Sequence, residues 1–371
     1  MNLRLRRSPT LALAGEIASA RLTGETVYSL STPTFPDRTG SIAADIRFGT
    51  TLTPGNGLAD LRDLARTGLF KKWKLPEHEC LIVGGAKSSI FCIIRTMLPA
   101  GGKVLVISPH WPSYEDLVRL AHLQPVFHET RADDGFEIDE FRLRESLRES
   151  GAGAVMCSNP GNPSGRVLGQ RELDTLCRET ADAGAILLLD ESFSNIVFDV
   201  PKWHDSVCSP EDHVFVVNSF SKNYHLQGLR LGACLVHRGR TAPVIAAHQT
   251  LLSAAPTPSQ NIALRIINSP EANPESYSEQ RRLMLDFAVA QGWPHVATEG
   301  GFYLFPYVEC LASFRRKLEA RRILSLPGET FGKGYRDHLR VCFGKPVSEI
   351  RALLGILAEI ADESPEMDRG R

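Results

Sequence analysis

Short apolar runs alternate with amphipathic stretches between about Cys80 and Val236, and this alternation limits the fold more than any other feature of the chain. The apolar runs have the length of strands and read CLIVGG, KVLVISP, QPVFHE, AVMCSNP, AILLLDES, VFVVNSFS and LRLGACLV. Stretches with helical periodicity, such as IDEFRLRESLRES and GQRELDTLCRETADAG, separate several of them. Apolar strands joined by helices are usually buried on both faces. We therefore predict an α/β fold in three layers, αβα, around a mostly parallel sheet.

The C-terminal part of the chain is expected to form a second, smaller α/β unit. Helices over about 242–291 would lead into it, and it contains GGFYLFPYV, HLRVCFG and a helix after Pro346. The 371 residues suffice for two domains, since one domain takes about 100–200 residues. We expect an N-terminal arm that joins the small domain (1–45), a large domain (46–270) and a small C-terminal domain (271–371).

The charge balance and the hydropathy argue against several classes of partner. The chain has 42 Lys and Arg against 43 Asp and Glu, a net charge of −1. This balance argues against a broad surface for nucleic acid or for acidic membranes. No apolar run approaches the ~18 residues of a membrane span. The start, MNLRLRRSPTLALAGEIASARL, is expected to be an arm or a helix rather than a targeting peptide, because Glu16 interrupts its apolar patch.

The cysteines indicate neither a metal site nor a disulfide framework. The eight residues are scattered, mostly inside apolar strings such as IFCII and GACLV. The sequence has no C-x-x-C pair and no cluster of histidine ligands, so we expect reduced core thiols. Reduced thiols favour a cytoplasmic location.

Polar or aromatic residues follow several of the predicted strands. VGGAKSS places Gly84 and Gly85 just before a helix, SPHWPSY places Trp111 in a turn, and SNPGNPSG places Asn162 between prolines. LLLDES ends an apolar strand on Asp190. Singly, these residues have ordinary explanations as a tight turn, a core side chain, a connector and a cap. Ligands of parallel sheets gather at the carboxyl ends of the strands, so together they indicate one site.

A lysine between two serines completes the pattern. Lys222 lies in NSFSKNYHLQGLRLG, with Ser219 three residues before it and Arg230 eight residues after it. The chain here resembles the fold-type-I pyridoxal-phosphate enzymes, specifically the class I/II aminotransferase family. The resemblance runs in family order from about residue 30 to 360, and its other motifs are TPGNGLADLR, GGAKSS, SPHWPSY, NPGNPSG, DES, GGFYLFP, LPGETFG and HLRVCFG. It implies the family's fold, with the cofactor bound by the large domain.

The resemblance implies that Lys222 is the catalytic lysine. It would form a Schiff base with the aldehyde of pyridoxal 5'-phosphate and, once displaced by substrate, act as a general base. This chemistry needs an amine that can be neutral near pH 7, and a cationic, partly dry pocket lowers the pKa of a lysine.

The resemblance also implies which residues bind the phosphate of the cofactor. Ser219 and Arg230 would bind it, together with backbone N–H groups at the helix start formed by Gly85, Ala86 and Lys87. Lys87 would act there through its backbone rather than through its charge.

The remaining implied roles concern the cofactor ring and the substrate. Asp190 would keep the pyridine nitrogen protonated, Trp111 would stack on the ring, and Asn162 would donate to the phenolate oxygen. Trp111 and Asn162 would also line the substrate, whose α-carboxylate Arg340 would bind through its planar fork. The alternative for Arg340 is a surface ion pair at a strand end.

The chain departs from the family pattern at three places. Phe193, expected beside the ring, replaces a tyrosine that donates to the phenolate oxygen. Leu52 replaces a tyrosine that reaches the partner subunit's phosphate. The segment YSLSTPTFP lacks the usual glycine of G-x-P.

Three functions are compatible with these residues. We expect an aminotransferase that passes the α-amino group of an amino acid to a 2-oxo acid. The alternative is another pyridoxal-phosphate reaction, such as elimination, replacement or a cyclisation like that of capreomycidine synthase. A regulatory module is a distant third. The family implies a homodimer.

Overall fold

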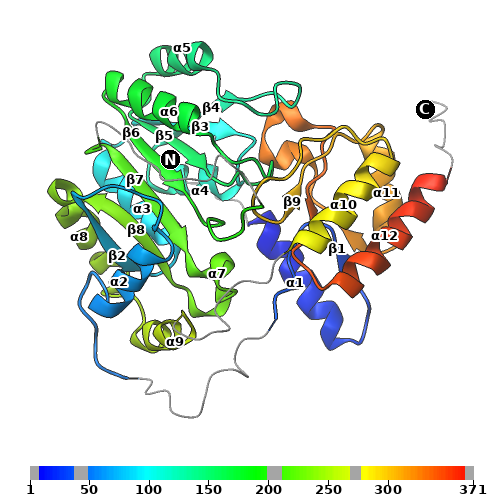
Figure 1. Ribbon diagram of the computed structural model, residues 1–371, viewed down its shortest axis with the longest axis horizontal. Coiled ribbons are helices and arrows are strands. Elements are labelled where there is room, and N and C mark those ends of the chain that lie inside the picture. The colour runs from blue at the N-terminus through cyan, green and yellow to red at the C-terminus, as the bar shows by residue number, and fades with distance from the viewer. Residues whose placement is uncertain (1–7, 37–48, 199–210, 268–276, 364–371) are drawn as a thin grey trace.

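A seven-stranded sheet forms the centre of the computed structural model, which describes residues 8–36, 49–198, 211–267 and 277–363 (Figure 1). All of its strands run in the same direction except β8, which is antiparallel to both of its neighbours. The mostly parallel sheet predicted from the sequence is therefore confirmed. In sheet order the strands are β2 (His78–Val83), β8 (Gly232–His237), β7 (Val214–Ser219), β6 (Ile186–Asp190), β5 (Ala154–Ser158), β3 (Lys103–Ser108) and β4 (Gln124–Glu129).

Helices cover both faces of this sheet, because successive strand residues point to opposite faces. Leu187 packs into the apolar cluster on one face and Leu188 into the cluster on the other. The helices of the first face are α2 (Ala59–Thr67), α5 (Glu140–Ser150), α6 (Gln170–Asp182) and α9 (Thr257–Ile267). Those of the second face are α3 (Ala86–Met97), α4 (Ser113–Leu120) and α8 (Thr241–Leu252).

Local signals define the ends of these helices. Asp139 precedes α5, and its side chain accepts a hydrogen bond from the N–H of Arg142 at 2.8 Å. Gly151 ends the helix with a φ of 61°, in the left-handed region that glycine adopts readily. Both signals can be read in the sequence, which places α5 within the predicted IDEFRLRESLRES stretch.

A smaller α/β part lies beside the sheet, on the right in Figure 1. It contains two short strand pairs and a third apolar cluster. The strands are β1 (Tyr28–Ser29) with β10 (Ile323–Leu324), and β9 (Tyr303–Leu304) with β11 (Val341–Cys342). The helices are α1 (Pro9–Leu22), α10 (Ser278–Ala290), α11 (Leu311–Ala320) and α12 (Val347–Asp362). The predicted domain boundaries, after residues 45 and 270, fall outside the described residues and stay predictions.

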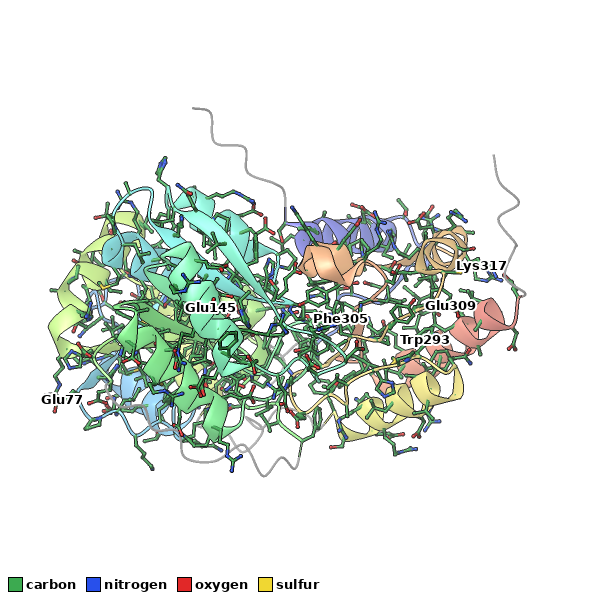
Figure 2. All side chains as sticks on the ribbon, turned by 90° about the horizontal axis from the view of Figure 1, so that it is seen from above. Glu77, Glu145, Trp293, Phe305, Glu309 and Lys317 are labelled. Atoms are coloured by element: carbon green, nitrogen blue, oxygen red, sulfur yellow. The ribbon has the colours of Figure 1, made fainter. Side chains whose placement is uncertain are left out.

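A cluster of aromatic residues joins the two parts. Phe136 packs with Phe305 at 6.3 Å between ring centres, and Figure 2 shows Phe305 at the junction. The Tyr335 hydroxyl donates to the carbonyl oxygen of Thr130 at 2.8 Å. These contacts hold the C-terminal part beside the carboxyl end of β4, and β1 of the N-terminal segment pairs with β10 of that part.

The cysteines differ from the expected reduced core thiols at two positions, and Cys310 is one of them because its side chain is exposed. Six of them, Cys80, Cys92, Cys157, Cys234, Cys310 and Cys342, are free thiols, and Cys208 lies outside the described residues. Cys177 on α6 is disulfide-bonded, so the prediction of reduced thiols is wrong there. No helix of the described segments is long and apolar enough to span a bilayer.

Candidate active site

The polar residues that follow the strands lie along one edge of the sheet. Asp190 at the end of β6 is in register with Ser158 at the end of β5. Ser219 at the end of β7 is in register with Gly232, where β8 begins. The carboxyl ends of these strands therefore meet at one place, as expected for a ligand site in a parallel sheet.

The start of α3 forms one end of this site. Gly85 precedes the helix with a φ of 95°, and a Cβ atom there would lie 3.1 Å from Nη2 of Arg230. A Cβ atom on Gly232 would lie 2.7 Å from the nitrogen of Ala86, so both glycines permit a close approach of the backbone. Free N–H groups at a helix start beside a guanidinium suit a phosphate group.

The lysine is carried by a short helix, α7 (Phe220–Asn223), which buried side chains hold in place. The Ser219 hydroxyl accepts a hydrogen bond from the N–H of Ser221 at 3.1 Å. The amide of Asn223 donates to Oδ1 of Asn218 at 2.6 Å. Four residues form only one helical turn, so these side-chain contacts compensate for the short backbone ladder.

Lys222 lies in surroundings that favour its neutral form. Burial lowers the pKa of Lys222 to about 8, and the positive charges of Arg340 and Arg230 add to this effect. Its Nζ atom lies 5.0 Å from the ring centre of Phe35 in the N-terminal segment. An amine with this pKa has a substantial neutral fraction near pH 7–8, as a nucleophile or general base requires.

Asp190 is buried and receives three hydrogen bonds. The hydroxyl of Tyr114 on α4 donates to Oδ2 at 2.8 Å. The N–H and the hydroxyl of Ser192 donate to Oδ1 at 3.0 Å and 2.6 Å. Burial raises the pKa of Asp190, and the three donors oppose that rise.

Trp111 and Lys87 face each other between α3 and α4. Nζ of Lys87 lies 4.7 Å from the ring centre of Trp111, whose ring packs edge-on against Tyr114 at 5.6 Å. Burial, together with the charge of Arg230, lowers the pKa of Lys87. The sequence indicated a role for the Lys87 backbone alone; the structure also brings its ammonium group to the site.

Arg340 is completely buried and lies between the rings of Tyr303, at 4.4 Å, and Phe331, at 4.7 Å. Its Nη1 donates to Oδ1 of Asn162 at 3.1 Å, and its Nη2 to the carbonyl oxygen of Ser31 at 2.8 Å. The surface ion pair considered for Arg340 is therefore excluded.

The charge of this guanidinium is not neutralised within the described residues. Its Nε has no hydrogen-bond partner there, and no carboxylate of these segments forms an ion pair with it. An unpaired buried cation is costly, so an anion such as a carboxylate fits beside it. Arg340 uses Oδ1 of Asn162, which leaves the amide NH₂ of Asn162 as a donor for another group.

Sequence reasoning missed four residues of the site. Tyr114 and Ser192 bind Asp190, and the carbonyl of Ser31 binds Arg340. Ser31 stands where the family glycine was missing, and its hydroxyl accepts the N–H of Leu326 at 2.9 Å. Phe35 stacks on His225 at 4.7 Å while it covers Lys222.

The other two departures from the family pattern lie in different surroundings. Phe193 is buried and packs edge-on against Phe302 at 5.2 Å and Tyr303 at 5.8 Å. Leu52 is 74% exposed. The contact of Phe193 with the cofactor ring stays a prediction. The loss of a contact with the partner subunit at Leu52 stays a prediction as well.

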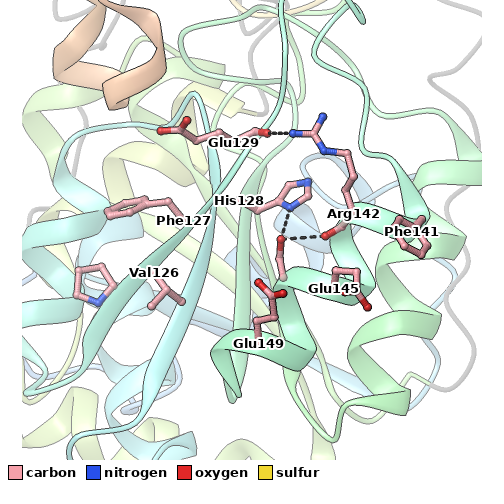
Figure 3. A pocket seen from close by; sticks show the side chains of 10 residues that line it. Val126, Phe127, His128, Glu129, Phe141, Arg142, Glu145 and Glu149 are labelled. Atoms are coloured by element: carbon pink, nitrogen blue, oxygen red, sulfur yellow. Dashed lines mark hydrogen bonds between the residues drawn. The ribbon is translucent and has the colours of Figure 1, made fainter.

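A pocket of about 670 Å³ lies away from these residues, between the edge strand β4 and α5 (Figure 3). It contains no candidate for catalysis, and β4 is three strands away from β6 in the sheet. Burial lowers the pKa of His128 there to about 4, so the imidazole is neutral at pH 7. The imidazole of His128 forms a 2.9 Å hydrogen bond with the hydroxyl of Ser146.

In the described segments no group of three or more His, Cys, Asp or Glu could hold a metal ion.

A model of the family described as "Aminotransferase class I and II" matches residues 43–357, most of the chain. With the fold and the side chains at the strand ends, this match defines a pyridoxal-phosphate-dependent transferase. The chain belongs to the class I and II aminotransferase family.

Curated relatives extend over most of the chain. A probable aspartate/prephenate aminotransferase of Aquifex aeolicus is 28% identical over 382 residues, covering 95% of this chain and 95% of its own length. A probable N-acetyl-LL-diaminopimelate aminotransferase of Bacillus subtilis is 27% identical over 315 residues, with 81% of this chain and 79% of its own length covered.

Solved structures show the same fold. The aspartate aminotransferase of Thermus thermophilus with maleate has a TM-score of 0.83 at 23% identity, covering 96% of this chain and 97% of that chain. The aspartate aminotransferase of Thermotoga maritima has a TM-score of 0.84 at 23% identity, with the same coverage.

Proposed function

We propose that this protein transfers the α-amino group of an amino acid to a 2-oxo acid, using Lys222 and Arg340 as its central residues. The observation that carries the proposal is the pairing of an amine of lowered pKa with a buried guanidinium that lacks an anionic partner in the described structure. The first suits proton transfer, and the second suits the α-carboxylate that amino acids and 2-oxo acids share. Relatives named as aminotransferases favour this reaction over elimination, replacement or cyclisation, and over a regulatory role.

The residues of the site fit pyridoxal 5'-phosphate. Arg230, Ser219 and the N–H groups of Ala86 and Lys87 at the start of α3 would hold its phosphate, with Gly85 allowing the approach. When bound, this cofactor supplies a sink for the electrons left when the substrate loses its α-proton.

Three side chains would position the ring. Asp190 would hold the proton of the pyridine nitrogen, and Trp111 would stack on the ring face. The amide NH₂ of Asn162 would donate to the phenolate oxygen, while Phe193 offers no second donor at that oxygen. The phenolate charge would then rest on fewer hydrogen bonds.

Lys222 would have two tasks. In the resting enzyme its amine would bind the cofactor aldehyde covalently. When it is not bound to the cofactor, Nζ would move the α-proton of the substrate, and Arg340 would hold the substrate carboxylate in a fixed orientation. Arg340 is completely buried beside two aromatic rings, and Nζ of Lys222 lies over the ring of Phe35.

A single turnover tests the reaction. The cofactor-loaded protein is mixed with a reactive amino acid in the absence of any 2-oxo acid. We expect one equivalent of pyridoxamine phosphate and one of the corresponding 2-oxo acid, measured by chromatography. Recovery of pyridoxal phosphate with a cyclised or eliminated product would refute transamination.

Arg340→Lys is expected to raise the KM for the amino acid about 10- to 100-fold, because a point charge replaces a planar fork and at least one charge-assisted hydrogen bond of about 1.5–3 kcal/mol is lost. Steady-state kinetics measure the change. Arg351→Lys, at an exposed arginine paired with Glu279, is the matched control and should leave KM unchanged. An unaltered KM in Arg340→Lys would remove Arg340 from the substrate site.

We also infer that the protein forms a homodimer, as the family implies. Leu52, Leu251 and Leu252 are 74%, 50% and 47% exposed and are available to a partner subunit. A cytoplasmic location remains a prediction from the sequence.

A further inference from the structure

The carboxylate of Asp190 is almost saturated with hydrogen bonds from the protein. An ionised carboxylate has about four acceptor sites, two on each oxygen. Oδ1 accepts from both the N–H and the hydroxyl of Ser192, and Oδ2 accepts from the hydroxyl of Tyr114. One acceptor site therefore remains, on Oδ2.

The two side-chain donors are themselves well fixed. Tyr114 is completely buried on α4, and burial next to Asp190 raises the pKa of its phenol, so the hydroxyl keeps its proton at neutral pH. Ser192 lies two residues after Asp190, which ends β6, so its hydroxyl is close to the Asp190 carboxylate in the chain as well as in space. Neither residue belongs to the roles implied by the family motifs.

The other ionisable groups near Asp190 do not stabilise its charge. Glu191 is buried, and its carboxylate pairs with Lys72 at 2.8 Å. Burial raises the pKa of the Cys157 thiol to about 12, so Cys157 is neutral. The hydrogen bonds of Tyr114 and Ser192 are thus the main local forces that favour the ionised form of Asp190 against burial.

We propose that Tyr114 and Ser192 are positioning residues that keep Asp190 ionised and leave a single acceptor site, on Oδ2, for the pyridine N–H of the cofactor. The proposal rests on the proposed function, because it assumes that Asp190 faces the ring nitrogen. Removing either hydroxyl makes the carboxylate more basic, so the shared proton moves from the ring nitrogen toward Asp190.

Infrared titration of the cofactor-free protein tests the first half of the proposal. The carboxyl band of Asp190 is identified as the band that Asp190→Asn removes. We expect its titration midpoint to rise by about 1–2 pH units in Tyr114→Phe and in Ser192→Ala, since a hydrogen bond to a charged group contributes about 1.5–3 kcal/mol. Ser192→Thr keeps the hydroxyl and should keep the midpoint.

Matched controls separate this effect from a general loss of packing. Tyr335→Phe removes a buried phenol that donates to Thr130, and Ser146→Ala removes a hydroxyl that bonds His128. Both should leave the midpoint of Asp190 unchanged. An unchanged midpoint in Tyr114→Phe and Ser192→Ala, or an equal shift in the controls, would overturn the proposal.

Nitrogen NMR of the protein loaded with ¹⁵N-ring-labelled cofactor tests the second half. We expect the ring resonance to move toward that of neutral pyridine in Tyr114→Phe and Ser192→Ala, and to stay in Ser192→Thr and both controls. If Asp190→Asn moves the resonance and the hydroxyl variants do not, the positioning role is wrong and the role of Asp190 stands. If Asp190→Asn leaves the resonance unchanged, the assignment of Asp190 in the proposed function fails.

Discussion

Lys222→Ala is expected to lower kcat at least about 10³-fold, because one residue would lose both its covalent and its proton-transfer role. The contacts proposed for the phosphate and the ring do not involve Nζ, so the variant should still bind the cofactor. Its absorption spectrum should match free cofactor aldehyde rather than a lysine adduct. Stopped-flow kinetics and equilibrium dialysis measure the two quantities separately.

Borohydride reduction gives a second readout on the wild-type protein. Reduction should fix the cofactor to the peptide that contains Lys222, as mass spectrometry would show. A small amine in the buffer should restore part of the activity of Lys222→Ala, because it can accept the α-proton in place of the side chain. An adduct on another lysine would contradict the assignment.

Lys103→Ala is the matched control for this variant. Lys103 lies at the amino end of β3, away from the strand ends that carry the site, and its Nζ donates to the carbonyl oxygen of Ser150 at 2.8 Å. We expect it to retain wild-type kcat. A comparable loss in Lys103→Ala would mean that the effect at Lys222 reflects stability rather than chemistry.

Much of the fold could be predicted because its signals are local. Each predicted run contains or overlaps one strand of the large sheet. Most of these runs are apolar because their strands are buried in the sheet, and the exception is the edge strand β4, where only His128 is buried. Asp190 could also be identified from a local signal, because a carboxylate that ends a wholly apolar strand needs a hydrogen-bond or ionic partner. The order of the motifs along the chain then indicated the aminotransferase family.

The contacts that complete the site depend on tertiary structure. Tyr114 is 76 residues from Asp190 in the chain, and the Ser31 carbonyl that binds Arg340 is 309 residues away. A backbone carbonyl carries no side-chain signal at all, so position 31 could be noticed only as a departure from G-x-P. Ser192 could have been found, because the backbone N–H two residues after an aspartate often donates to its side chain within a turn.

Asp190→Asn is expected to lower kcat roughly 10²- to 10³-fold while the cofactor stays bound, as for other groups that stabilise charge developing in a transition state. The substitution changes little in shape. The amide oxygen can still accept both hydrogen bonds of Ser192, and the Tyr114 hydroxyl can turn to accept from the new NH₂ group. The fold and the phosphate contacts should therefore persist.

What the amide cannot do is accept the pyridine N–H at the remaining position, because its nitrogen is a donor. The ring nitrogen should then lose its proton at neutral pH, and the electrons released with the α-proton lose their sink. Asp139→Asn, at the N-cap of α5, is the control and should leave kcat unchanged, since asparagine caps helices as well as aspartate does. If Asp190→Asn turned over amino acids at the wild-type rate, Asp190 would be a structural residue and the electron sink would not depend on it. A loss of kcat with unchanged cofactor affinity and unchanged melting temperature would instead place the whole effect in the chemical step.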